Sequence, residues 1–298
     1  MTPTASVSCG CSTTAEPAAE PRPRPEPRPR RRLATVHPTS RPQTSRPQTS
    51  RPLRGRRLSR AIALALAPVL VPQTVRVRRT VPKLPEAPRP WEGGGGTDPL
   101  QLLVLGDSMA VGVGVDDAAE GLAGHLAAGL TERTGHPVRW RARGRNGATA
   151  RDVIDDHLAE ALSEPADLIV LSIGANDAMQ VRSHRAFRRD VKRILHDIFA
   201  AHPGAIVLIG ALPAFHRFAT LPEPLRSTLS LHARALDVAA RRALERFPRA
   251  HMSPELPPFS EGFFASDDFH PSAQGYREWA EFALDDAWSH GIARVLPS

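Results

Sequence analysis

Short strand-like runs, some continuously apolar and some alternating between apolar and polar residues, are separated by longer segments of helical periodicity along the last two thirds of the chain. Each run has the length of a strand buried on both faces, and each longer segment repeats its apolar residues at helical spacing. This alternation favours a parallel sheet covered by helices on both faces, with right-handed crossovers. We expect strands at 102–105, 138–142, 168–173 and 206–212, with a weaker pattern at 249–252, and helices at 118–133, 150–162, 184–201, 225–247 and 272–290.

Composition divides the chain into three parts. Residues 1–57 are rich in proline, arginine, serine and threonine. Such a segment cannot bury enough apolar surface to offset the entropy lost on ordering, so we expect a disordered tail. Residues 58–96 combine a short apolar segment with a proline-rich linker that ends in four consecutive glycines. Residues 97–298 are long enough to enclose one core and are expected to form the α/β domain.

Positive charge is concentrated ahead of this domain. Residues 1–95 hold 17 arginines and one lysine against five acidic residues, a net charge of +13 in a chain whose total is +8. The remainder is therefore acidic, with a net charge of −5, and gives no electrostatic reason for the domain to bind nucleic acid. Both cysteines, Cys9 and Cys11, lie in the tail, which leaves the domain without a disulfide or a cysteine-based metal site.

The apolar segment 61–71 has basic residues on both sides, including arginines at 76, 78 and 79. It is shorter than the about 20 apolar residues that a spanning helix needs, and Pro68 interrupts it. Residues 61–79 could therefore contact a membrane surface peripherally, or they could equally pack on the domain as an N-terminal arm. A basic stretch before an apolar one also resembles an export signal. Membrane-associated, exported and cytoplasmic locations all remain open.

Small and polar residues follow the predicted strands, at 106–108, 143–149, 174–177 and, near the C-terminus, 266–271. In open α/β sheets, ligands bind at the carboxyl edge, where such loops meet. Ser108 is expected where the first strand passes into a helix, whose N-terminal N–H groups would face it.

These loops contain the groups that acyl transfer requires. A serine hydroxyl becomes a nucleophile when a neutral imidazole takes its proton, and a carboxylate orients that imidazole. Ser108, His270 and Asp267 supply the three groups, and the three-residue spacing lets the carboxylate reach the far ring nitrogen through a local turn. Candidate oxyanion donors are the N–H groups of Ser108 and Gly147 and the side-chain amide of Asn176.

Three neighbouring residues offer alternatives. Gly144 could replace Gly147, which we favour because residues 146–149 lead directly into the next helix. Asp268 could replace Asp267 as the partner of the imidazole. Asp177 and the asparagine before it could instead cap the following helix.

Taken together, GDS after the first strand, a glycine in the second loop, GAND after the third strand and DxxH near the C-terminus resemble the SGNH (GDSL-type) hydrolase family. The resemblance covers about residues 100–290 and implies an esterase or lipase on a flavodoxin-like, three-layer α/β/α sandwich. It implies Ser108 as nucleophile, His270 as base and Asp267 as orienting carboxylate. Gly147 and Asn176 would donate to the oxyanion together with the Ser108 amide, and neither a cofactor nor a metal is expected.

Met109 departs from the leucine of the family's name-giving motif, a residue of similar volume. Other motifs fail on spacing, because G-x-G-x-x-G needs glycine at 108, G-x-S-x-G needs it at 110, and no H-E-x-x-H occurs.

We expect a small-molecule, lipid or carbohydrate ester as substrate, with Phe215, Phe218 and Leu221 as candidate walls of an apolar pocket. The alternatives are a non-catalytic carbohydrate- or lipid-binding protein on the same fold and an adaptor that acts through its basic tail. The sequence does not define an oligomeric state.

Overall fold

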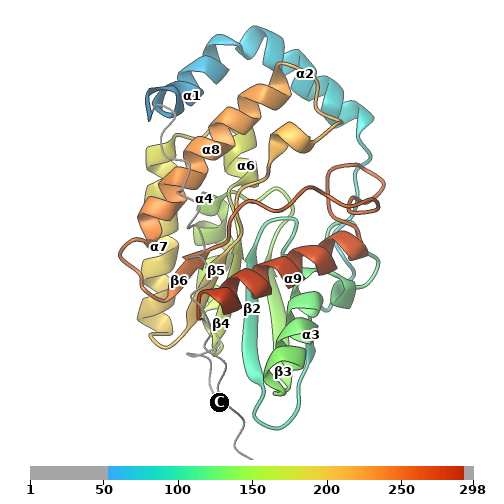
Figure 1. Ribbon diagram of the computed structural model, residues 1–298, viewed down its shortest axis with the longest axis vertical. Coiled ribbons are helices and arrows are strands. Elements are labelled where there is room, and N and C mark those ends of the chain that lie inside the picture. Colours follow the sequence, from blue (N-terminus) through green and yellow to red (C-terminus); the bar gives the residue numbers. More distant parts are fainter. Residues whose placement is uncertain (1–52, 292–298) are drawn as a thin grey trace, which may run out of the picture. The chain divides into compact units, whose positions relative to one another are not determined.

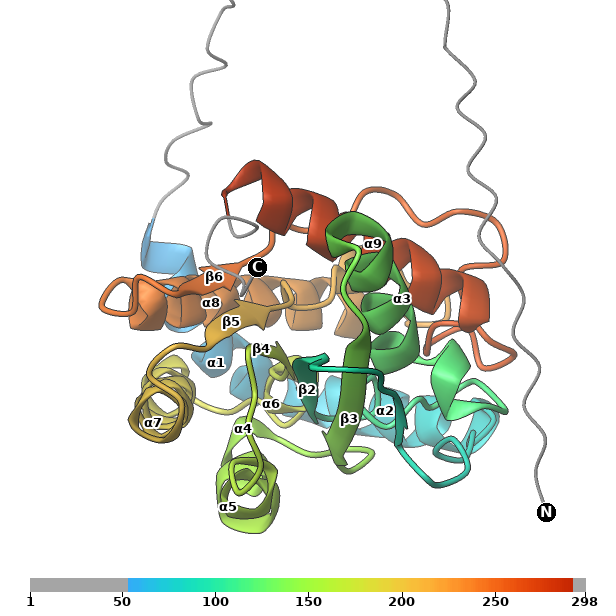
Figure 2. The same cartoon turned by 90° about the horizontal axis from the view of Figure 1, so that it is seen from below.

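The computed structural model describes residues 53–291 (Figures 1 and 2). Residues 1–52 of the predicted tail lie outside the described residues, and residues 53–57 form the first turn of helix α1 (Leu53–Ala65). The described part contains one six-stranded sheet with the strand order β1-β3-β2-β4-β5-β6. Its strands are β1 (Glu92–Gly94), β2 (Leu100–Gly106), β3 (Val138–Gly144), β4 (Leu168–Ser172), β5 (Ile206–Ile209) and β6 (Ala250–Met252).

Strands β2 to β6 are parallel, as the sequence predicts, while β1 pairs with β3 in the antiparallel sense. Strand β5 ends at Ile209, earlier than predicted, although the Gly210 amide still donates to the carbonyl of Leu171 in β4. A Cβ atom on Gly210 would lie 2.5 Å from the Trp279 ring. The carboxyl ends of β3, β2 and β4 lie side by side, since Gly106 pairs with both Gly144 and Ser172.

Helices cover both faces of the sheet and form a three-layer α/β/α sandwich (Figure 2). Leu102 and Val104 of β2 face α3 (Leu122–Thr134) and α9 (Ala273–Ser289). Leu103 and Leu105 point to the other face and pack in the core with the remaining helices. These include α4 (Ala150–Asp152), α5 (Leu158–Ala161), α6 (Ala175–Met179), α7 (His184–Ala201) and α8 (Leu225–Leu244).

Helix α7 has the predicted bounds because its apolar residues recur every three or four positions and Ser183 caps its N-terminus. The helix predicted at 150–162 is interrupted. A turn of π-helix, Val153–His157, separates α4 from α5. Thr149 and Asp152 form a capping box that fixes where this segment begins.

The predicted linker is part of the packed domain. Ala87 and Trp91 are buried, and residues 92–94 form strand β1. The main chain of Ala87 donates to the carbonyl of Val111, 3.0 Å away. The segment rich in proline and glycine therefore follows an irregular path along the edge of the sheet and does not act as a flexible linker.

Helices α1 and α2 (Ala67–Thr80) form an arm that packs on α8 (Figure 1). Ala63 and Leu70 are buried beneath it. Among the described helices, none is by itself long and apolar enough to cross a membrane. Leu58–Ala65 and Ala67–Thr80 satisfy that test of length and composition only as a pair, bent by 79°.

Candidate active site

The loops after β3, β2 and β4 meet at the carboxyl edge of the sheet. A Cβ atom on Gly106 would overlap the carbonyl of Ser172, and one on Gly144 would overlap the carbonyl of Gly106. Glycine is therefore required at both strand ends for the backbones to approach this closely. Gly144 has this packing role, whereas a Cβ atom on Gly147 would meet no atom within 4 Å.

Ser108 lies in a turn and not at the start of a long helix, so the predicted helix N-terminus behind it is wrong. The amide of Val111 donates to the carbonyl of Asp107, and that of Val113 donates to the carbonyl of Ser108. The long helix α3 begins only at Leu122. The donors near the hydroxyl are thus individual loop N–H groups, without the aligned dipole of a helix.

Asp107 anchors this turn from inside the core. It is 2% exposed, and its Oδ1 accepts hydrogen bonds from Ser172 Oγ at 2.8 Å and from the Met109 amide at 3.2 Å. Burial raises the pKa of Asp107 to about 6, although these two hydrogen bonds oppose the rise. Asp107 forms part of the floor of the cleft that Ser108 lines.

We expect Asp107→Asn to stabilise the fold at neutral pH. A carboxyl whose pKa is higher in the folded state favours folding while protonated. That advantage is lost as pH rises from the unfolded value of about 3.9 through the folded value. Asparagine keeps Oδ1 and carries no charge, so the gain over wild type should grow across this range and approach about 3 kcal/mol. Urea unfolding at pH 4 and pH 8 measures it. The exposed control Asp116→Asn should show no such growth, and a gain that is independent of pH would contradict the explanation.

His270 and Asp267 form the shortest polar contact of the site. His270 Nδ1 lies 2.6 Å from Asp267 Oδ2, and the amides of Phe269 and His270 donate to Asp267 Oδ1 at 3.0 and 2.9 Å. The Asp267 carboxylate is buried, and the backbone of its own loop holds it in place through these two hydrogen bonds. Asp268 is exposed and has a φ of 51°, so Asp267 is the aspartate that contacts the imidazole.

The loop that carries His270 is held against the turn that carries Ser108. Tyr276 donates its hydroxyl hydrogen to the carbonyl of Val113 at 2.8 Å, and burial raises the pKa of this tyrosine, which keeps it a donor. A Cβ atom on Gly114 would lie 2.6 Å from the carbonyl oxygen of Pro271. Residues separated by more than 150 positions are therefore fixed side by side.

Ser108 and His270 line the same cleft, which encloses about 840 Å³ including its open mouth. Within residues 53–291, no hydrogen bond joins the serine hydroxyl to the imidazole. Hydrogen bonds to a general base often become short only when substrate binds. The arrangement places a hydroxyl and an oriented imidazole on one surface.

The predicted oxyanion donors come from three loops. Among the described residues, no hydrogen bond uses the backbone N–H of Ser108 or of Gly147, and Gly147 has a φ of 81°. Asn176 is buried, and its Nδ2 donates one hydrogen to the carbonyl of Ala148 at 3.0 Å, which leaves the second hydrogen. Gly147 and Asn176 do not line the 840 Å³ cleft.

Asp177 has a structural role. Its Oδ2 accepts from the amide of Ala150 at 2.9 Å and so caps α4, a different helix from the one expected. Arg182 joins the buried Asp177 and Asp190 through contacts of 2.8 and 2.6 Å. This network ties the third loop to the second and supports the position of Asn176.

Aromatic side chains form much of the cleft wall, which sequence reasoning largely missed. Phe218 lines it as expected, whereas Phe215 and Leu221 lie in the core behind it. Most of the other rings come from the single segment between β6 and α9. They are Phe259, Phe263, Phe264, Phe269 and, from α9 itself, Trp279.

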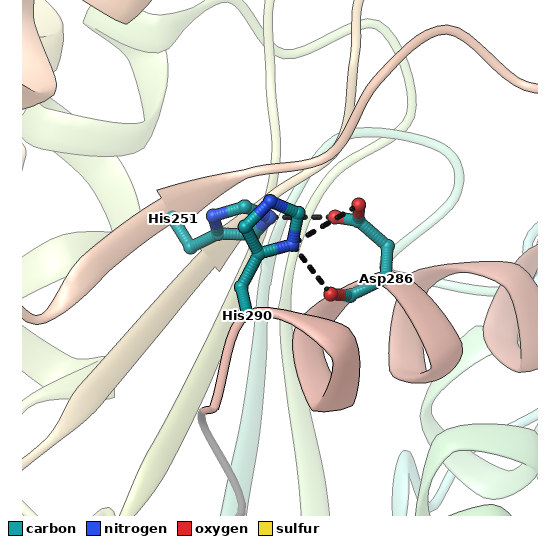
Figure 3. Close-up of side chains that lie close together, drawn as sticks. All are labelled: His251, Asp286 and His290. Atoms are coloured by element: carbon teal, nitrogen blue, oxygen red, sulfur yellow. Dashed lines mark hydrogen bonds and ion pairs between the residues drawn. The ribbon is translucent and has the colours of Figure 1, made fainter. Parts of the chain in front are cut away.

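A second cluster of polar side chains closes the last turn of α9 onto β6 (Figure 3). Asp286 lies 2.6 Å from His251 Nε2, while His290 Nδ1 lies 3.4 Å from the carboxylate and 2.8 Å from the Asp286 carbonyl. Two imidazoles and a carboxylate are ligands that a transition metal takes. His251 Nε2 and His290 Nδ1 already have hydrogen-bond partners within the cluster. The three side chains therefore fix the C-terminal end of α9 to β6, at the opposite end of the helix from His270.

The chain is similar in sequence and in fold to known ester hydrolases. A model of the GDSL-like Lipase/Acylhydrolase family matches residues 104–278. The GDSL-like esterase Rv1075c of Mycobacterium tuberculosis is 29% identical over 245 residues, 74% of this chain and 76% of that protein. The lipase Lip_vut3 from a goat rumen metagenome shares the fold with a TM-score of 0.50 and 18% identity, over 63% of this chain and 97% of its own. The lipase/acylhydrolase of Enterococcus faecalis has a TM-score of 0.50 and 19% identity, over 64% of this chain and 96% of its own.

Proposed function

Because this chain belongs to the GDSL-like lipase/acylhydrolase family and is an ester hydrolase, we propose that it cleaves carboxylic esters through an acyl-enzyme formed on Ser108. The observation that carries the proposal is the 2.6 Å contact between His270 Nδ1 and the buried Asp267, on a loop fixed beside the serine. Membership of an esterase family sets aside the alternative of a non-catalytic binding protein on this fold.

The proposed reaction has two balanced steps. His270 Nε2 takes the Ser108 proton as Oγ bonds to the ester carbonyl carbon, and the tetrahedral intermediate expels the alcohol, which receives that proton. Water then attacks the acyl-enzyme, with His270 as base and afterwards as acid. The carboxylic acid leaves and the serine is restored. Asp267 holds the proton on Nδ1 throughout, so that Nε2 is free to accept.

Covalent labelling tests this mechanism directly. A fluorophosphonate should modify the wild-type protein once, and mass spectrometry of peptides should place the adduct on Ser108. Labelling should disappear in Ser108→Ala and persist in Ser163→Ala, an exposed serine outside the cleft. An adduct on another serine would overturn the assignment of the nucleophile.

Asn176 is proposed to donate to the oxyanion together with the amides of Ser108 and Gly147. We expect Asn176→Ala to lower kcat by on the order of 10²–10³ with little change in KM, since the bond forms mainly in the transition state. Steady-state kinetics on a nitrophenyl ester measure the loss. Gln180→Ala removes an exposed amide one turn later and should leave kcat unchanged. A change confined to KM would assign Asn176 to ground-state binding.

The ring-lined cleft is proposed to bind an apolar acyl chain. Phe218 has ring centroids of Phe264 and Phe269 at 5.3 Å and lies among the lining residues. We expect kcat/KM to be higher for octanoyl than for acetyl esters, and Phe218→Ala to reduce the octanoyl value about tenfold while changing the acetyl value less. Phe199→Ala removes a ring stacked on Phe247 outside the cleft and controls for general loosening. Equal losses for both esters would make Phe218 a purely structural residue.

A further inference from the structure

The arm formed by α1 and α2 carries the exposed large apolar side chains of the described residues. They are Leu58, Ile62, Leu64, Val69, Val71 and Val75. Leu64 and Val71 are each 58% exposed. Their clustering on two consecutive helices, while the rest of the described surface has none, marks the arm as a surface for a partner.

The charge of the arm indicates what that partner is. Between Leu58 and Thr80 the sequence contains no acidic residue, and Arg60, Arg76, Arg78 and Arg79 are exposed. Outward apolar side chains followed by three arginines at the end of α2 match the two layers of an anionic bilayer surface, in which acyl chains lie beneath phosphates. The long arginine side chains can reach phosphate while their stems stay on the apolar side.

The opposite face of the arm is bound to the domain. Ser59 and His232 are buried and joined by a 3.0 Å contact, and burial lowers the pKa of His232, which keeps the imidazole neutral. Arg60 Nε donates to the carbonyl of Val181 at 3.2 Å. Insertion across a bilayer would break these contacts and expose Ala63 and Leu70. The geometry therefore favours an arm that lies on the surface.

The arm also contacts the segment that leads out of the cleft. Gln73 donates to the carbonyl of Glu223 at 2.7 Å and accepts from the amide of Leu225 at 3.2 Å. The loop that ends there begins after β5 and carries Phe218 of the cleft wall. We propose that the arm docks the enzyme on anionic membranes through its six apolar side chains and its arginines, at the active-site edge of the sheet. Membrane binding itself does not depend on the proposed catalytic mechanism.

Sedimentation of the full chain with vesicles tests this proposal. Phosphatidylcholine vesicles with phosphatidylglycerol should bind the wild type and retain part of it at high salt, where binding by a basic tail alone would be lost. The double variant Leu64→Gln, Val71→Gln should lose the salt-resistant part by at least about tenfold. Equal salt-resistant binding by this variant and wild type would overturn the proposal.

Two triple variants that remove the same number of positive charges distinguish binding by the arm from attraction by the overall charge of the protein. Arg76→Gln, Arg78→Gln, Arg79→Gln should weaken binding at low salt by roughly fivefold per arginine. The control Arg242→Gln, Arg246→Gln, Arg249→Gln removes three exposed charges around the far end of α8 and should change binding much less. Equal losses would contradict docking by the arm.

Two further measurements complete the test. Sedimentation velocity of the wild type without lipid detects self-association. A dimer that dissociates in the Leu64→Gln, Val71→Gln variant would assign the face to a second copy and overturn membrane docking. Hydrolysis of a water-soluble acetyl ester should be the same in this variant and wild type, which keeps the test of docking separate from the test of the catalytic mechanism.

Discussion

Ser108→Ala is expected to lower kcat for a small nitrophenyl ester by on the order of 10⁴–10⁶. The substitution removes the atom that forms the acyl bond, while the remaining oxyanion donors and the cleft can still favour attack by water. The residual rate should therefore exceed the rate in buffer alone. Initial rates at saturating ester, measured with the variant and wild type side by side, give this ratio.

The fold should survive this substitution. Within the described residues the Ser108 side chain forms no hydrogen bond, and the turn is held by Asp107 and by the carbonyl of Ser108. The unfolding midpoint of Ser108→Ala should match that of wild type. Ser163→Ala removes a hydroxyl that binds only its own helix end and should retain full activity. Substantial turnover by a well-folded Ser108→Ala variant would place the nucleophile elsewhere.

The sheet and the order of its loops could be predicted from sequence because parallel strands buried on both faces have continuous apolar runs. Continuous apolar runs begin at Leu102 in β2 and at Leu168 in β4, whereas residues 138–142 of β3 alternate apolar residues with arginines. Once the strands are parallel, their following loops must share an edge. The proximity of the Ser108, Gly147 and Asn176 loops follows from topology, without knowledge of any side-chain position.

Strand β1 and the turn after β2 could not be predicted, for different reasons. Glu92, Gly93 and Gly94 have low strand propensity, and β1 forms because β3 offers an open edge. The residues after Ser108 have helical composition from 118 onward, but glycines at 112 and 114 adopt positive φ and end the first turn early. Strand β1 thus depends on pairing with a distant strand, and the turn after β2 depends on local backbone conformation.

The cleft wall was also beyond the sequence pattern. Phe259, Phe263 and Phe264 lie in a loop without periodicity, so no rule assigns their side chains to a face. They gather because the loop turns back at the Phe264–Pro271 bridge, which brings it against Phe218. Chemistry placed at strand ends is predictable from topology, whereas the shape of a substrate site built from loops depends on contacts between them.

Asp267→Asn is expected to lower kcat by about 10⁴ while leaving the fold intact. Asparagine retains Oδ1, which accepts the amides of Phe269 and His270. It replaces Oδ2 with an amide that donates to His270 Nδ1, so the ring proton moves to Nε2. In that tautomer Nε2 has no lone pair for the serine proton. KM should change little, because the carboxylate orients the base and does not line the cleft.

Asp268→Asn is the matched control, because it makes the same change of charge one residue away on an exposed side chain whose positive φ asparagine tolerates. It should keep nearly full activity. Nitrogen-15 shifts of the His270 ring should show the proton on Nδ1 in wild type and in Asp268→Asn, and on Nε2 in Asp267→Asn. An unchanged tautomer with full activity would remove Asp267 from the mechanism. Equal losses of kcat in Asp267→Asn and Asp268→Asn would mean that Asp267 acts only through its negative charge near the cleft. Only the contact of Asp267 with the imidazole distinguishes these two neighbouring carboxylates.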